Sequence, residues 1–329
     1  MVWSIAKMAA PGSFQDVADG FQLVSSKKRR KRRENRHKQT TGYLGHSQEN
    51  GEDDNIDLNK LETKILAAKE ELRCSEFFST VQEIFRHVKS GDWEKLCVPD
   101  TQGSPSTSCQ CNGLRRTPST CHQYCSDCGT LADDLQTEFE AVVCYGLGRF
   151  SCCVTARYQL AFLLLLRDVL DVPSSCHVYD PVFSSCEKLL LQKLGCQLIL
   201  ENEEGKRQVD SRTLFYMPHC GKPLYNNLLW ANWGQQLHNV VILGNSLSNM
   251  ALRCPSQELE KAAFYIHSIL DHTKEFPLPN NFHFQDIFND LSLHVFPASD
   301  IPPSLWQQTT EPVYDLDWQE EIITNCDKS

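Results

Sequence analysis

From residue 141 onward, short apolar runs alternate with longer segments that have the periodicity of helices. Apolar runs of about five residues are typical of buried strands, and strands that alternate with helices form parallel sheets covered on both faces. We therefore expect an α/β domain over residues 131–298, with a Rossmann-like, doubly wound and mostly parallel sheet. The predicted strands are 141–145, 176–179, 196–200, 213–217, 239–243 and 292–296, and the predicted helices are 151–170, 183–194, 224–234 and 257–270.

The segments on either side of this domain differ from it in composition. Residues 1–55 carry few periodic apolar residues and are expected to be a disordered tail, whereas residues 56–96 have a 3.6-residue apolar period and are expected to be helical, with a break at 74–75. Residues 97–130 are rich in Ser, Thr, Pro and Cys, which indicates a linker or insertion. Residues 299–329 form an acidic tail with aromatic residues, which favours a partly docked C-terminal arm.

Charge is distributed unevenly along the chain. The net charge is −10, but residues 27–38 contain nine Lys or Arg and one Glu, which leaves −18 for the rest. Because an acidic body repels nucleic acid, binding to DNA or RNA is expected only through the basic segment. That segment is either a nuclear-import signal or a solvated tail that contacts acidic surfaces weakly. Its core consists of Lys27, Lys28, Arg29, Arg30, Lys31, Arg32 and Arg33.

The sequence contains no run of 18 apolar residues and no pattern typical of a signal peptide. We therefore expect an intracellular protein in the cytoplasm and nucleus, without a membrane span. The chain has sixteen cysteines, and disulfides are uncommon in intracellular proteins. Cys144, Cys176 and Cys196 are accordingly expected to be single buried residues that pack as small apolar side chains.

The turn after the first predicted strand carries the pattern Gly146-x-Gly148-x-x-Ser151 and opens a predicted helix. In nucleotide-binding domains, glycines at this place let the backbone approach a ligand, and the N–H groups at the helix start attract an anion. Arg149 lies within the same turn. Ser151 replaces the third glycine, so the alternative is a tight turn that needs small residues for packing.

Asp180 follows the second predicted strand in the sequence Val178-Tyr179-Asp180-Pro181. An acid at this place can accept hydrogen bonds from a ribose, both in nicotinamide-dependent enzymes and in methyltransferases. Its alternative role is to cap the next helix.

Further polar residues follow the fourth and fifth predicted strands. His219 and Cys220 come directly after the fourth, where a Cys next to a His can act as a nucleophile or bind metal or haem, although no Asp or Asn completes a nucleophilic triad. Their alternative is a polar loop that satisfies its own backbone. Asn226 and Asn227 begin the next predicted helix, and Asn245 ends the fifth strand. Because ligands of open α/β sheets bind at the carboxyl ends of the strands, we expect these loops to surround one shared site.

The segment 97–130 contains cysteines at close spacing, some of them as Cys-x-x-Cys. Thiolates at this spacing bind zinc well, but the pattern matches no standard zinc ribbon or finger, so redox-variable or incidental cysteines are the alternative. The candidate zinc ligands are Cys109, Cys111, Cys121, Cys125 and Cys128.

Several longer motifs follow one another between about residues 141 and 297. They are 142–150 (VVCYGLGRF), 155–161 (TARYQLA), 179–181 (YDP), 215–220 (FYMPHC), 225–230 (YNNLLW) and 288–290 (FND). Together these motifs resemble the sensitivity-to-red-light-reduced (SRR) family, and the cysteine-rich segment lies outside them. The resemblance implies a regulatory role: light signalling and clock control in plants, and control of haem biosynthesis and clock gene expression in animals. It supplies no established catalytic residue.

The sequence therefore leads to three hypotheses. The first is a regulatory, non-enzymatic protein with protein partners. The second is an enzyme, either a methyltransferase or an NAD(P)-dependent oxidoreductase, that binds a nucleotide-type cofactor through Gly146, Gly148 and Asp180. The third is a haem sensor that binds haem through His219 or Cys220.

Overall fold

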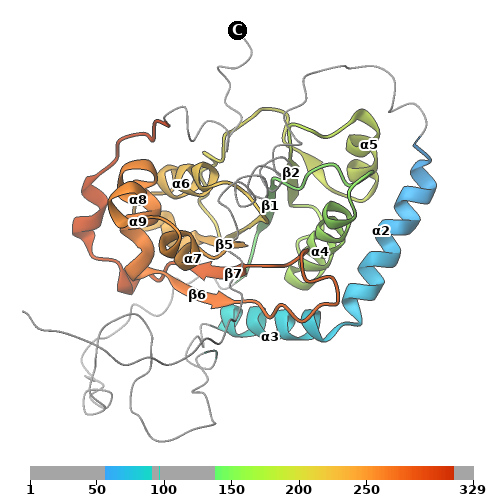
Figure 1. The fold of residues 1–329 in the computed structure, drawn as a ribbon, viewed down its shortest axis with the longest axis horizontal. Helices are drawn as coiled ribbons and strands as arrows, with labels where there is room; N and C mark the ends of the chain where they lie inside the picture. Colours follow the sequence, from blue (N-terminus) through green and yellow to red (C-terminus); the bar gives the residue numbers. More distant parts are fainter. Residues whose placement is uncertain (1–55, 91–95, 97–137, 315–329) are drawn as a thin grey trace, which may run out of the picture. The chain divides into compact units, whose positions relative to one another are not determined.

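The computed structural model describes residues 56–90, 96 and 138–314. These residues form a mixed α/β structure around a seven-stranded, mostly parallel sheet with the strand order β3-β2-β1-β4-β5-β7-β6 (Figure 1). The strands are β1 (Ala141–Tyr145), β2 (Cys176–Tyr179), β3 (Gln197–Leu198), β4 (Thr213–Met217), β5 (Val240–Asn245), β6 (Lys274–Pro277) and β7 (Leu291–Val295).

The central strands are parallel and buried on both faces. β1 pairs in parallel with β2 on one side and with β4 on the other, and β4 pairs in parallel with β5. All five residues of β4 are buried, as expected for a strand covered by helices on both sides. The predictions for β1, β2 and β4 are confirmed at both ends.

The far edge of the sheet differs from the prediction. β7 pairs antiparallel with β5 and with β6, and β6 was not predicted. Its sequence, Lys-Glu-Phe-Pro, buries one side chain, that of Phe276, so it lacks the continuous apolar run that marks the central strands.

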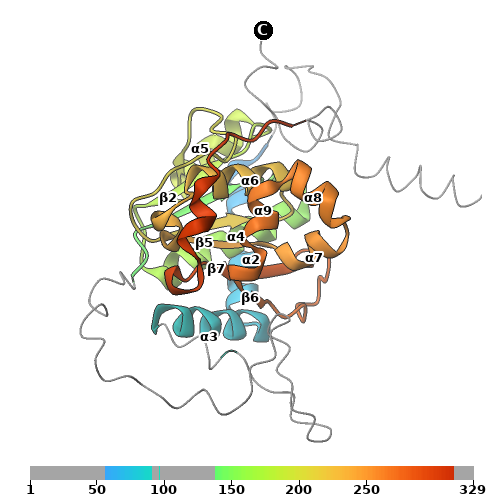
Figure 2. The same cartoon turned by 90° about the vertical axis from the view of Figure 1, so that its left-hand side faces the viewer.

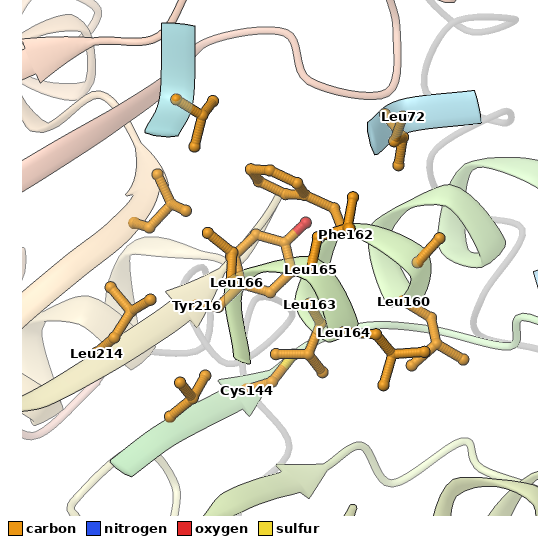
Figure 3. Packing of buried hydrophobic residues seen from close by; sticks show 14 of the residues in the cluster. Leu72, Cys144, Leu160, Phe162, Leu163, Leu164, Leu165, Leu166, Leu214 and Tyr216 are labelled. Carbon is orange, nitrogen blue, oxygen red and sulfur yellow. The ribbon is translucent and has the colours of Figure 1, made fainter. Parts of the chain in front are cut away.

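Helices cover both faces of the sheet. One face is covered by α3 (Glu76–Ser90), α4 (Val154–Leu170) and α5 (Ser185–Lys193), and α2 (Leu58–Arg73) packs on the outer side of α4 and α5 (Figure 1). The core on this side includes Cys144, Phe162, Leu214 and Tyr216 (Figure 3). The other face packs against α6 (Lys222–Ala231), α8 (Ser256–Ala262) and α9 (Phe264–Ile269). The remaining elements are α7 (Leu247–Leu252) and the 3₁₀ turns η4 (Gln235–Asn239), η5 (Leu270–His272), η6 (Ala298–Asp300) and η7 (Pro303–Gln307).

Three helix predictions require correction. The predicted helix 224–234 is α6, which begins at Lys222 and ends at Ala231. The predicted helix 257–270 is two helices, because the backbone at Ala263 is not helical (φ −146°, ψ 61°). The helix predicted from residue 151 begins at Val154, after the turn. The break predicted at 74–75 is confirmed, since Cys74 ends α2 and α3 begins at Glu76. Figure 2 displays α3 beside β6 and β7.

None of the helices in residues 56–90 and 138–314 combines the length and the apolar composition that crossing a bilayer requires.

Candidate functional site

The strand order reverses at β1. From β1 the chain adds β2 and β3 on one side of the sheet, and it then crosses over to add β4 and β5 on the other side of β1. In open α/β sheets ligands bind outside the carboxyl ends of the strands at such a switch point. Gly146 follows β1 directly and has a φ of +70°, and Gly148 has a φ of +78°. The predicted glycine turn therefore lies at the switch point, and its backbone needs glycine at both positions.

Cys220 covers the first glycine of this turn. A Cβ atom on Gly146 would lie 2.5 Å from Cys220 Sγ, and this thiol donates a hydrogen bond to the Tyr145 carbonyl at 3.4 Å. Burial, together with the nearby Asp180, raises the pKa of the Cys220 thiol. Cys220 is therefore a protonated, buried group, which disfavours roles as a nucleophile or as a thiolate ligand.

Asp180 holds the second glycine. Its Oδ2 accepts a hydrogen bond from Gly148 N at 2.7 Å, and its Oδ1 accepts one from Val182 N at 3.0 Å. Burial raises the pKa of this carboxyl, although the two N–H groups act in the opposite direction. Both carboxylate oxygens are thus engaged by backbone near the turn.

A second carboxylate, from Glu187, holds the end of the turn. Glu187 is fully buried, and it accepts hydrogen bonds from Ser151 N at 2.8 Å and from Ser184 N at 2.9 Å. Arg149 Nε lies 3.8 Å from the same carboxylate. The sequence analysis missed Glu187, although Ser184-x-x-Glu187 is a capping-box pattern that could have identified it.

His219 and Asn245 meet at the ends of β4 and β5. His219 N donates to Asn245 Oδ1 at 2.8 Å, and His219 Nε2 lies 3.2 Å from the carbonyl oxygen of Ile287. Gln159 Nε2 donates to the same carbonyl at 3.2 Å. His219 is exposed and has a φ of +56°, which is unusual for a residue other than glycine and is often found at functional sites.

The two predicted residues of α6, Asn226 and Asn227, hydrogen-bond to several other parts of the chain. Asn226 Oδ1 accepts a hydrogen bond from Tyr265 N, and Asn227 Nδ2 donates one to the Glu204 carbonyl. Both side chains also bond the hydroxyl of Tyr314. This hydroxyl accepts a hydrogen bond from Asn226 Nδ2 at 3.1 Å and donates one to Asn227 Oδ1 at 2.7 Å. Asn226 and Asn227 therefore bond the C-terminal segment, and Asn227 also bonds the loop after β3; their role in ligand binding stays a prediction.

We name residues 303–314 the C-terminal strap. Trp230 Nε1 donates to the Thr309 carbonyl at 3.0 Å, Trp233 Nε1 donates to the Leu305 carbonyl at 3.1 Å, and the Tyr265 hydroxyl donates to the Thr310 carbonyl at 2.6 Å. Three aromatic side chains, from α6, from the segment just after it and from α9, thus bond the backbone of the C-terminal strap.

Two predicted sites lie outside the described residues: the basic run 27–33 and the candidate zinc ligands Cys109, Cys111, Cys121, Cys125 and Cys128. Within the described residues, no group of three or more His, Cys, Asp or Glu gathers in a way that could hold a metal ion. The zinc site stays a prediction.

The chain is similar to named proteins from animals and a plant. It is 51% identical over 132 residues to an SRR1-like protein of Mus musculus, covering 39% of this chain and 53% of that protein. It is 33% identical over 173 residues to an SRR1-like protein of Drosophila melanogaster, covering 52% and 60%. It is 39% identical over 113 residues to Protein SENSITIVITY TO RED LIGHT REDUCED 1 of Arabidopsis thaliana, covering 34% and 41%. The matches span about half the length of these relatives.

No solved structure matches the chain. The model of the SRR1 domain matches residues 115–295, which is more than half of the chain. This span begins before the motifs at 141 and includes Cys121, Cys125 and Cys128 of the cysteine-rich segment. The chain therefore belongs to the SRR1 domain family.

Proposed function

We propose that this chain is a regulatory protein that acts through protein partners, without catalysing a reaction, in the control of haem biosynthesis and of circadian clock gene expression. Its family supports the regulatory part, since a plant relative is named for sensitivity to red light. The observation that carries the non-enzymatic part is the glycine turn, where buried carboxylates of the chain itself bind Gly148 N and Ser151 N.

The physical argument concerns the anion that a nucleotide cofactor would bring. A pyrophosphate at a glycine turn needs backbone N–H groups that point at it. Here Asp180 and Glu187 already accept hydrogen bonds from two of these groups, so a phosphate would have to displace both side chains from them. Two N–H groups of the turn are thus already hydrogen-bonded within the chain, which suits a structural role of the turn in a protein that binds partners.

The direct test is removal of the protein from cells, followed by complementation. We expect altered haem content and altered clock transcripts, restored by the wild-type chain and also by the exposed-site variant Glu201→Gln as a matched control. Unchanged haem and clock transcripts would overturn the proposed processes without affecting the family assignment.

The second candidate is a Rossmann-type enzyme, either a methyltransferase or an NAD(P)-dependent oxidoreductase. The strand order favours it, because β3-β2-β1-β4-β5 matches the first five strands of the doubly wound nucleotide-binding fold, with Gly146 at the switch point. This is an argument from fold, and fold alone does not establish a function.

A thermal-shift screen with S-adenosylmethionine, NAD and NADP separates the two candidates. A ligand present at 100 times its Kd stabilises the folded state by about 2.7 kcal/mol. We expect no shift with any of the three. A shift that Asp180→Ala abolishes would favour the enzyme.

Direct haem sensing is a third candidate, and the exposed His219 is its remaining ligand, since Cys220 is buried and protonated. Titration of the purified chain with haem tests it. A Soret band that His219→Ala removes would establish haem binding, and an unshifted spectrum would exclude it.

We also propose that the chain occurs in both cytoplasm and nucleus, with the basic run 27–33 as its import signal. A fluorescent fusion with these seven residues changed to alanine should be excluded from the nucleus, whereas the wild-type fusion should enter it. Equal nuclear signal for both would leave the run as a solvated tail.

A further inference from the structure

Two buried thiols lie side by side at the edge of the sheet. Cys176 is the first residue of β2, Cys196 immediately precedes β3, and their Sγ atoms are 3.9 Å apart. Both residues are buried. The expectation that these cysteines are buried is confirmed, but the two are in contact with each other instead of isolated, and the proposed function makes no use of this contact.

The register of the two strands places the pair in a geometry that a disulfide can adopt. His177 is the partner of Gln197 in the parallel ladder, so the preceding residues, Cys176 and Cys196, lie opposite each other. Neighbouring strands are about 4.8 Å apart, and disulfides bridge Cα atoms that are about 4.4–6.8 Å apart. Bond formation then requires rotation of the side chains, with little movement of the backbone.

A positive charge lies beside the pair. Arg167, in the last turn of α4, donates from Nη1 to the Leu194 carbonyl at 2.6 Å, which is two residues from Cys196. Its Nε is buried and has no hydrogen-bond partner within the part of the chain that the structure describes. The hydrogen bond from Cys176, and then Arg167, lower the pKa of Cys196 against the effect of burial. These two effects favour the thiolate form of Cys196, and the thiolate is the reactive form of a cysteine.

We propose that Cys176 and Cys196 form a reversible disulfide when the chain meets a hydroperoxide. The Cys196 thiolate attacks the terminal peroxide oxygen, the O–O bond breaks, and the leaving alkoxide takes a proton and departs as an alcohol. This step leaves Cys196 as a sulfenic acid. The Cys176 thiol then loses its proton and attacks the sulfenic sulfur, the S–O bond breaks, and the oxygen departs as water. Two thiols are oxidised by two electrons, and one hydroperoxide is reduced to one alcohol and one water.

The buried pair lies next to the edge of the sheet, where local opening would admit a small oxidant. β3 has two residues and forms the outer edge of the sheet, where only β2 pairs with it. Local opening is easiest at such edges, where few contacts are lost. Reduction by a small dithiol follows the same route, so the bond reports the redox state around the protein.

The test uses the full-length chain, first reduced and then treated with limiting hydrogen peroxide. After an acid quench, remaining thiols are alkylated with N-ethylmaleimide in denaturant, and the chain is digested for mass spectrometry. Trypsin leaves Cys176 and Cys186 on one peptide, because no Lys or Arg lies between them, so chymotrypsin is added to cut after Tyr179. We expect a peptide pair linked through Cys176 and Cys196 that dithiothreitol separates.

Matched variants assign the bond and its cause. Cys186→Ser should keep the link, whereas Cys176→Ser and Cys196→Ser should each remove it. Arg167→Lys keeps a positive charge and should form the link faster than Arg167→Gln does. The chain unfolded in urea should show no preference for this pair over the other cysteines.

Two results would overturn the proposal. In the first, exposed Cys74 and Cys152 are oxidised while Cys176 and Cys196 are both recovered as alkylated thiols. In the second, the link forms as readily in urea as in the folded chain, which means that the folded geometry does not direct it.

Discussion

Gly146 shows at the scale of one residue why the turn after β1 tolerates little change. Its φ is +70°, and the thiol of Cys220 occupies the place where a side chain would begin. The backbone conformation and the close approach of sulfur are two separate reasons for glycine, and a pair of variants can separate them.

We expect Gly146→Ala to destabilise the fold by about 2–4 kcal/mol, since the left-handed backbone costs about 1–2 kcal/mol and the clash with Cys220 adds to it. Cys220→Ala in the same chain removes the clash and should restore about 1 kcal/mol. Urea unfolding of the two single variants and the double variant measures this coupling. Strictly additive effects would mean that the sulfur does not limit the position.

Glu187 is the buried carboxylate on which the same turn depends. Glu187→Gln replaces one acceptor oxygen by an NH₂ group, so either Ser151 N or Ser184 N loses its partner, and we expect a loss of about 2–3 kcal/mol. Ser184→Ala removes only the helix cap and should cost about 1 kcal/mol. Glu201→Gln, at an exposed position, serves as the control in the same unfolding series. Equal losses of unfolding free energy for Glu187→Gln and Ser184→Ala would mean that Glu187 contributes only to the helix cap and not to the turn.

At the scale of elements, Glu275 ties β6 to the start of α7. Its Oε2 accepts hydrogen bonds from Ser248 N at 3.0 Å and from Ser248 Oγ at 2.7 Å. Burial raises the pKa of Glu275, but His294, Ser246 and Ser248 lower it by more, so that it lies well below 4.5. The charged form is therefore bound more tightly in the folded chain than in the unfolded chain.

A carboxyl whose pKa is lower in the folded chain than in the unfolded chain stabilises the fold when the pH is above its pKa in the unfolded chain. This stabilisation is lost as the pH falls toward its pKa in the folded chain. We expect the free energy of unfolding to decrease as the pH falls below 4.5, and Glu275→Gln to flatten that decrease. Urea unfolding at several pH values, with Glu258→Gln on the exposed part of α8 as the control, measures the difference. The same slope in wild type and Glu275→Gln would contradict the assignment.

The sequence predicts elements well where one local signal dominates. β1, β2 and β4 are short apolar runs, and their ends agree with the structure. β6 and the break at Ala263 were missed because their cause is tertiary: β6 exists through pairing with β7, and Ala263 carries no local signal for a break. The same limit applies to Asn226 and Asn227, whose partner Tyr314 lies 88 and 87 residues away.

The C-terminal strap gives a prediction at this scale. Tyr314→Phe keeps the ring but removes the hydroxyl that bonds Asn226 and Asn227, so we expect a loss of about 1–2 kcal/mol. Limited proteolysis should then cut within 303–314 faster than in wild type. Val313→Ala, whose side chain is exposed, should leave the rate unchanged. Unaltered proteolysis of Tyr314→Phe would mean that Trp230, Trp233 and Tyr265 hold the strap without it.

For the molecule as a whole, the folded unit extends beyond the matched SRR1 domain on both sides. That domain covers 115–295, whereas α2 and α3 precede it and the strap follows it. α2 packs against α4, and the strap accepts hydrogen bonds from Trp230 of α6 and Tyr265 of α9. The folded structure therefore includes parts of the chain that the family pattern does not cover.

Phe77 of α3 makes this support concrete. Its ring stacks on Phe288 with centroids 4.5 Å apart, and it also contacts Phe162 and Phe282. Phe288 adjoins Ile287, whose carbonyl oxygen lies 3.2 Å from His219 Nε2. A chain of contacts thus leads from the N-terminal helices through the segment before β7 to the exposed histidine of the candidate site.

We expect Phe77→Ala to cost about 3–5 kcal/mol and to loosen residues 282–290 beyond this global loss. Phe78→Ala is the matched control, because Phe78 is equally buried and packs edge-on against Phe162 from the same helix. Native-state hydrogen exchange, compared at equal global stability by adding urea to wild type, separates the two effects. Faster exchange of 282–290 in Phe77→Ala than in Phe78→Ala means that α3 positions the loop beside His219. Equal exchange in both variants would mean that α3 contributes only to global stability and does not position the loop beside His219.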